Sequence, residues 1–368
     1  WGAIVAPFII GLIADRFFNA EKILAVLHLA GAAILFQMHN ATDFSVFYPY
    51  VLGYMVLYMP TLALVNSVAF RQMKDPSKEF STIRVWGTIG WIVAGLIISY
   101  IFAWDARDNI DRGFLSNTFL LSSGAAFVLG IFSFTLPATP PTAKSQKKVT
   151  LGEIVGADAF RLLRDRNFTV FFVSSILICI PLAFYYQNAN PFLAEIGVDN
   201  PTGKMTLGQV SEVGFMLLLP VFLHRFGIKL TLLCGMLAWV LRYLLFAFGN
   251  ADEQLFMLIT GIALHGICYD FFFVSGQIYT DSKAGERYRS SAQGMITLAT
   301  YGLGMLIGFS AAGFITDHFT TVFTTGQVHN WQSIWLFPAV FAGIVAVIFL
   351  LFFKRERHFI NLNNGETP

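Results

Sequence analysis

The sequence predicts an all-α polytopic membrane protein, and three observations support that prediction. Of the 368 residues, 56% are hydrophobic and only 12% are charged, which is about half the charged fraction of soluble domains. Apolar runs long enough to cross a bilayer, about 17–25 residues each, recur along the whole chain. The formal net charge of +2 argues against nucleic acid as a partner, because such proteins carry a strongly basic surface.

Eleven apolar runs are predicted to be membrane-spanning helices, at residues 1–16, 22–38, 45–71, 80–103, 114–136, 168–194, 205–223, 229–248, 254–280, 289–315 and 331–353. Of the 24 Lys and Arg residues, only Arg107, Arg112 and Lys204 lie in one set of alternate loops, and Arg242 lies inside a span. The others lie at or near the opposite ends of the spans, Arg84 just inside one such end, and they include those of the turn DSKAGERYR at 281–289. By the positive-inside rule, these basic loops, the central linker and the C-terminus are cytoplasmic.

The stretch PATPPTAKSQKK is a long, polar and proline-rich connector, which is typical of a linker. We therefore predict an N-terminal helix bundle at 1–136, a cytoplasmic linker at 137–167, a C-terminal bundle at 168–358 and a cytoplasmic tail at 359–368. Six spans follow the linker and five precede it. This count predicts two six-helix bundles, with the first helix of the N-terminal bundle lying before Trp1.

Polar side chains inside the spans fall into four groups, each spaced for one helical face or its neighbourhood. They are Arg84, Thr88 and Trp91; Gln187 and Asn190; Gln209 and Glu212; and His265, Tyr269 and Asp270. An ionised side chain at a helix centre costs roughly 2.5–3.5 kcal/mol, so the two intramembrane acids indicate function. Polar faces on four separate spans favour a shared water-filled cavity.

Structural interpretations stay open for each group. A single Gln or Asn can link helices by a hydrogen bond, and His265 can be a satisfied core histidine. Glu212 and Asp270 can form structural ion pairs with Arg84 or Arg242, and Trp91 can be a packing residue. We interpret Arg242 itself as structural.

Motifs of several other functions are missing from the sequence. It contains no G-x-x-x-x-G-K phosphate loop, no G-x-S-x-G elbow and no H-E-x-x-H motif. We expect neither an enzyme nor a bound cofactor or metal.

The stretch GLIADRFFNAEK resembles the loop between the second and third helices of the major facilitator superfamily. Gly11, Asp15, Arg16 and Lys22 match the pattern, and Phe18 replaces its second glycine. The resemblance implies the major facilitator fold and a gating role for Gly11, Asp15 and Arg16. It also implies that the absent span is the first helix of that fold.

Within that superfamily, the four polar groups resemble the nucleoside:proton symporter family. The resemblance rests on RVWGTIGW, QNAN, QVSE and DFFFVSG, and it extends over essentially the whole chain. It implies a nucleoside site formed by Arg84, Thr88, Gln187, Asn190, Gln209, Glu212 and Asp270. Trp91, His265 and Tyr269 stand where the family has other aromatic residues, which leaves purine or pyrimidine preference open.

We therefore expect proton-coupled nucleoside uptake across the cell (inner) membrane by alternating access. The nucleoside is expected at the midplane between the two bundles, with Glu212 and Asp270 as proton-coupling residues and the proton gradient as the energy source. The protein is expected to act as a monomer in the lipid bilayer. Two alternatives stay open: a major facilitator carrier for another polar solute such as an oligosaccharide, and a membrane enzyme or receptor without transport.

Overall fold

The computed structural model describes residues 18–72, 76–140, 157–323 and 326–356. Its contacts divide the chain into two units. Unit 1 comprises residues 1–90 and 103–155, and unit 2 comprises residues 91–102 and 156–368. The linker and bundle boundaries expected from the sequence stay predictions.

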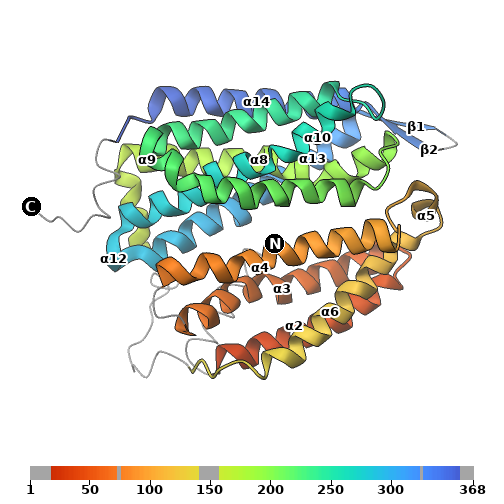
Figure 1. Cartoon of the computed structure of the whole chain (residues 1–368), viewed down its shortest axis with the longest axis horizontal. Coiled ribbons are helices and arrows are strands. Elements are labelled where there is room, and N and C mark those ends of the chain that lie inside the picture. Colours follow the sequence, from red (N-terminus) through yellow and green to blue (C-terminus); the bar gives the residue numbers. More distant parts are fainter. Residues whose placement is uncertain (1–17, 73–75, 141–156, 324–325, 357–368) are drawn as a thin grey trace, which may run out of the picture. The chain divides into compact units, whose positions relative to one another are not determined.

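The first half of the described chain is helical, in agreement with the sequence prediction (Figure 1). Its elements are α2 (Ala20–His39), α3 (Phe44–Gln72), α4 (Pro76–Leu96), η1 (Ile97–Ile101), α5 (Arg107–Asp111), η2 (Phe114–Ser116) and α6 (Asn117–Ser133). In unit 1, α2 packs against both α3 and α6. The last turns of α4 and the π-helical η1 belong to unit 2, where η1 contacts α9.

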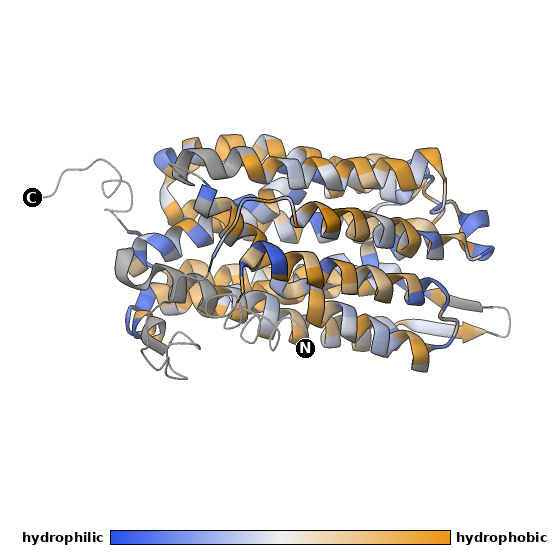
Figure 2. Ribbon diagram, turned by 90° about the horizontal axis from the view of Figure 1, so that it is seen from below, coloured by the Kyte–Doolittle hydropathy of each residue, from blue (hydrophilic) through white to orange (hydrophobic). Residues whose placement is uncertain are grey.

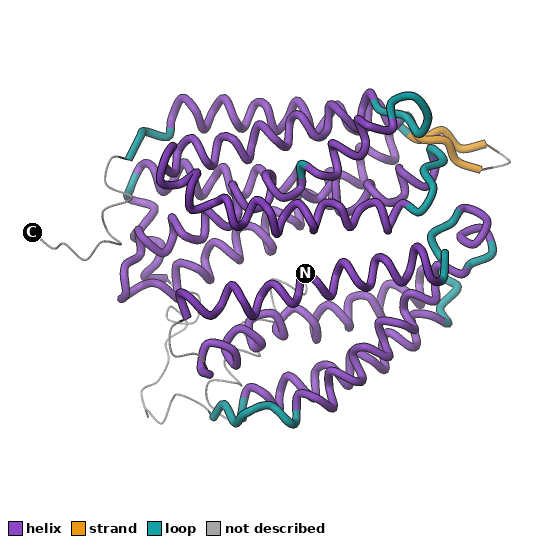
Figure 3. Tube along the Cα trace, viewed as in Figure 1, coloured by secondary structure: helices purple, strands orange, loops and turns teal. Residues whose placement is uncertain are grey.

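Unit 2 is a bundle of long helices, and a pair of short strands projects from one end of it (Figure 3). After η3 (Ala157–Arg164), the elements are α8 (Arg166–Glu195), α9 (Pro201–Phe248), α10 (Leu255–Ala263), α11 (His265–Tyr269), η4 (Asp270–Val274), α12 (Ser275–Thr297), η5 (Leu298–Gly304), α13 (Met305–His318), β1 (Thr320–Phe323), β2 (Gly326–His329) and α14 (Trp331–Phe352). The antiparallel β1–β2 pair, with Thr320 opposite His329, was not predicted from the sequence.

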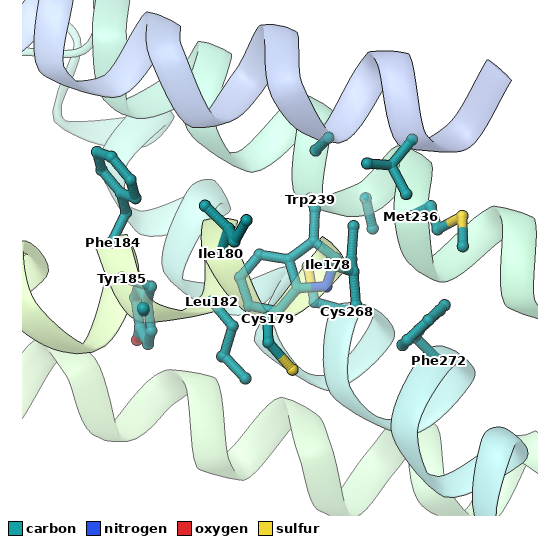
Figure 4. Close-up of a cluster of buried hydrophobic side chains, with 14 of the residues drawn as sticks. Ile178, Cys179, Ile180, Leu182, Phe184, Tyr185, Met236, Trp239, Cys268 and Phe272 are labelled. Carbon is teal, nitrogen blue, oxygen red and sulfur yellow. The ribbon is translucent and has the colours of Figure 1, made fainter. Parts of the chain in front are cut away.

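The core of unit 2 is aromatic. Trp239 and Tyr243 of α9 are fully buried, and Tyr243 stacks on Trp335 of α14 with ring centroids 5.6 Å apart. Figure 4 shows the Trp239 indole among side chains of α8 and the Cys268 and Phe272 side chains. This packing fixes α8, α9 and α11 against one another, and those helices carry most of the predicted site.

Helix α9 contains two of the expected spans, 205–223 and 229–248. The two segments meet at Gly227, whose φ of 73° and ψ of 172° interrupt the helix. A side chain is strained at that φ, so glycine suits the position. The basic residues His224, Arg225 and Lys229 flank this break, as expected for a loop between spans.

The prediction of a turn at 281–289 is wrong. Helix α12 runs through these residues, from Ser275 to Thr297. Lys, Ala, Glu and Arg are good helix formers, and the stretch has no proline to end the helix. A charged composition alone therefore did not indicate a turn.

Seven described helices are long and apolar enough to cross a membrane, and the apolar residue pattern is visible along them (Figure 2). Large apolar side chains also face outward, such as Val128 of α6 and Leu351 of α14, which are 66% and 69% exposed. Such surfaces suit contact with lipid. The prediction of an all-helical membrane protein agrees with these helices, whereas the count of eleven spans stays a prediction.

Candidate functional site

Most of the predicted site residues lie in unit 2. They are Trp91, Gln187, Asn190, Gln209, Glu212, His265, Tyr269 and Asp270. Thr88 lies on α4 within unit 1 and is half-buried. Arg84 belongs to helix α4, but its side chain is outside the described part of the structure. Gly11, Asp15 and Arg16 lie wholly outside the described residues.

Helix α8 contributes the two predicted amide side chains. Asn190 donates through Nδ2 to Thr202 Oγ1 at 2.8 Å, at the start of α9. Gln187, one turn earlier, is half-buried, and no hydrogen bond joins it to another described residue. Asn190 therefore links two helices, while Gln187 keeps its donor and acceptor available.

Helices α9 and α11 approach closely because glycines face the partner backbone. A Cβ on Gly266 would lie 2.6 Å from the carbonyl of Ser211, and one on Gly208 would lie 3.1 Å from His265 Cβ. The Gly266 N–H donates to Ser211 Oγ at 3.0 Å. This contact brings His265 Nε2 to 3.8 Å from Glu212 Oε2, with the two side chains 5% and 12% exposed.

Behind this pair lies a buried arginine. Arg242 is 0% exposed, and its Nη1 lies 3.1 Å from His265 Nδ1. Its guanidinium carbon sits 3.4 Å from the centre of the Tyr185 ring, a cation–π contact. Tyr185 also stacks on His265, with centroids 5.5 Å apart. The sequence interpretation of Arg242 as a structural residue did not include these contacts.

Tyr269 and Asp270 lie side by side in sequence but in different surroundings. The Tyr269 ring stacks on His265 at 5.9 Å, and its hydroxyl shares a 2.8 Å hydrogen bond with Tyr301 of η5. Asp270 is fully buried at the first residue of the π-helical η4. Such π-helical turns are frequent at functional sites.

Trp91 lies on the part of α4 that belongs to unit 2. Gly95, one turn further on, faces Thr206 of α9, and Tyr100 lies against Gly203. The two helices therefore run antiparallel, and one turn of helix places Trp91 level with Gln209 and its neighbours. The indole is 71% exposed.

Sequence reasoning missed three residues that complete this arrangement, namely Tyr185, Ser211 and Tyr301. No polar pattern distinguishes Tyr185 and Tyr301 from other aromatic residues of an apolar span. Ser211 precedes Glu212, but its role depends on Gly266, which is 55 residues away. Only the packing of α9 on α11 brings the two together.

The described residues do not hold a metal-binding group of three or more His, Cys, Asp or Glu side chains. Two open surface depressions lie elsewhere, along α6 and around Pro220 and His224, with volumes of about 620 and 740 Å³. Neither includes a predicted site residue. Within unit 2, the arrangement offers the partly exposed Glu212 carboxylate, the buried Asp270 carboxylate, amide groups and aromatic faces. Together these groups can bind a polar molecule with a flat ring.

Comparison with known proteins agrees with this chemistry. The family model described as Nucleoside H+ symporter matches residues 1–358. The putative nucleoside transporter YegT of Escherichia coli K12 is 44% identical, covering 96% of this chain and 83% of that protein. The xanthosine permease of the same organism is 33% identical, covering 96% and 84%.

Solved structures confirm the fold. Two crystal structures of the nucleoside transporter NupG, one of them a point mutant, superpose with TM-scores of 0.80 and 0.77 at 28% and 27% identity. Each covers 96% of this chain and 88% of that one. The predicted major facilitator fold and the predicted transporter class are thereby confirmed. The chain belongs to the nucleoside H+ symporter family.

Proposed function

We propose that this protein carries nucleosides into the cell together with protons, by alternating access. The observation that supports this most is the match of residues 1–358 to the nucleoside H+ symporter family. A transporter of this family is a multi-pass membrane protein and not an enzyme. The proton gradient supplies the energy, and no cofactor is needed.

The nucleoside is proposed to bind the polar face of unit 2. Glu212 accepts from ribose hydroxyls, and the half-buried Gln187 and Gln209 offer both donors and acceptors to the base. The exposed Trp91, level with Gln209, supplies a stacking face. Stacking of a base on an aromatic ring contributes about 1–3 kcal/mol and tolerates different bases.

The proton is proposed to be carried by Glu212, with Asp270 as the second candidate. Both carboxyl groups lie within apolar helices, where a charge is costly without a partner or water. Glu212 keeps 12% of its side chain exposed, whereas Asp270 is fully buried. Water and substrate therefore reach Glu212 more easily, which supports its assignment as the first carrier.

Uptake of labelled uridine or adenosine into proteoliposomes, with the outside made acidic, tests the function. We expect accumulation above the outside concentration, competed by other nucleosides and not by sugars. Competition by oligosaccharides instead would favour a carrier for another polar solute. Acid-driven accumulation that survives both Glu212→Gln and Asp270→Asn would refute the proton assignment.

We further propose that the protein acts as a monomer. Its linker and C-terminus are proposed to be cytoplasmic, because Lys and Arg concentrate on that side. A single cysteine introduced by Ser145→Cys, with the three native cysteines replaced, tests the orientation. It should react with a membrane-impermeant maleimide in inside-out vesicles and stay unlabelled in right-side-out vesicles. The reverse pattern would overturn the topology.

A further inference from the structure

Arg242, a buried cation of unit 2, has no carboxylate partner among the residues that the structure describes. Arg242 is 0% exposed, and among the described residues no acid lies within ion-pair distance of it. Its Nε and Nη2 atoms are buried without a hydrogen-bond partner in the described part of the chain. Burying a charge costs several kcal/mol per ion, unless its surroundings compensate. The contacts that Arg242 does make therefore matter.

One of these contacts fixes the state of His265. An arginine side chain has only N–H donors, so at the 3.1 Å contact His265 Nδ1 must be the acceptor. The imidazole is then neutral, and its proton sits on Nε2. That nitrogen is the one that lies 3.8 Å from Glu212 Oε2. The N–H of His265 is therefore carried by the nitrogen that lies 3.8 Å from the carboxylate.

We propose that His265 is a positioning residue that orients the Glu212 carboxylate and that Arg242 holds His265 in the required tautomer. The inference rests on the proposed function, because Glu212 is assigned there to the nucleoside and the proton. The 3.8 Å separation exceeds a hydrogen bond, and a closure of about 0.6 Å would form one of ~3.2 Å. The close backbone contact at Gly266 holds the two helices near enough for this closure.

The same geometry argues against His265 as a stacking partner for a base. Its side chain is only 5% exposed, and its ring lies against Tyr185 and Tyr269, with centroids 5.5 and 5.9 Å away. A purine or pyrimidine would have to displace one of these rings. His265 therefore acts on the nucleoside through Glu212.

Two substitutions of His265 separate its two nitrogens. His265→Gln reaches the place of Nε2 and can donate to Glu212, whereas His265→Asn reaches only the place of Nδ1 and can accept from Arg242. Positioning of Glu212 predicts that KM for nucleoside counterflow stays within about threefold of the original protein in His265→Gln. In His265→Asn it rises about tenfold, as expected for the loss of one hydrogen bond to a charged group.

Equal KM values in the two variants would overturn the proposal. If both values rise, His265 stacks directly on the nucleoside; if neither changes, His265 has a purely structural role. The matched control is the same pair of substitutions at His28, a half-buried histidine of α2 in unit 1. Both control variants should keep the original KM.

The role of Arg242 is tested by rescue. Arg242→Met removes the donor to Nδ1, so we expect its KM to rise about tenfold. Adding His265→Gln should restore most of the affinity, because glutamine needs no arginine to fix its tautomer. A double variant no better than Arg242→Met alone would contradict the assignment.

Measurements of melting temperature separate two possible failures, that of this inference and that of the proposed function. Absence of nucleoside counterflow in the original protein would refute the function. Independently of transport, the melting-temperature losses of Arg242→Met and His265→Ala should be clearly non-additive, because the two side chains share one contact. Additive losses would show that the two residues are uncoupled and would overturn the proposal.

Discussion

The contact between α9 and α11 can be tested at Gly266. A Cβ added there would lie 2.6 Å from the carbonyl carbon and oxygen of Ser211 and 2.7 Å from the amide nitrogen of Glu212. These neighbours are backbone atoms, which cannot turn aside as a side chain does. The two helices must therefore separate by about 0.8 Å to restore an ordinary contact of ~3.4 Å.

The cost of Gly266→Ala follows from this separation. Overpacking of this kind destabilises by about 1–3 kcal/mol, and loss of the Gly266 N–H bond to Ser211 Oγ adds about 0.5–1.5 kcal/mol. The His265–Glu212 distance would grow from 3.8 Å to about 4.6 Å if the separation acts along it. We expect a lower melting temperature in detergent and a nucleoside KM raised about tenfold.

Gly214→Ala is the matched control. It lies on α9 two residues after Glu212, and nothing lies within 4 Å of an added Cβ. Alanine favours a helix over glycine by about 0.5–1 kcal/mol, so we expect an unchanged or slightly higher melting temperature. If Gly266→Ala melts and transports like Gly214→Ala, the close approach of α9 and α11 is not what positions His265 beside Glu212.

Two other contacts give further predictions. Tyr185→Leu should destabilise by about 2 kcal/mol, because the desolvated cation–π contact with Arg242 is lost. Tyr185→Phe should be neutral or stabilising in a melting assay, since the buried Tyr185 hydroxyl has no hydrogen-bond partner in the described structure. A large loss of stability in Tyr185→Phe would contradict the role assigned to the ring face. Asn190→Ala and Thr202→Ala should share a coupling free energy of about 0.5–1.5 kcal/mol in a double-mutant cycle of chemical unfolding. A coupling near zero would show that the Asn190–Thr202 bond does not join α8 to α9.

The sequence predicted the helices well because long apolar runs leave few alternatives in a membrane. It failed where helix continuity depends on local propensity and not on polarity. Residues 281–289 are charged yet helical within α12. The hairpin after α13 was missed because its strands are only four residues each, too short for a clear alternation.

The candidate site was predictable in its polar members and not in their partners. Glu212 and His265 stand out because each interrupts an apolar run. The proximity of Glu212 and His265 could not be predicted in the same way. It depends on Gly266 and Gly208, which look like ordinary glycines in the sequence. Likewise, nothing in the sequence around Arg242 indicates that its partner is His265, which lies 23 residues away on another helix.

Proton movement in Glu212→Gln tests the central claim most directly. Proteoliposomes containing a trapped pH-sensitive dye would report internal acidification when a nucleoside is added outside, and counterflow of labelled nucleoside would be measured in parallel. We predict that Glu212→Gln retains measurable counterflow and loses the acidification. Acidification that persists in Glu212→Gln at the rate of the original protein would contradict the account.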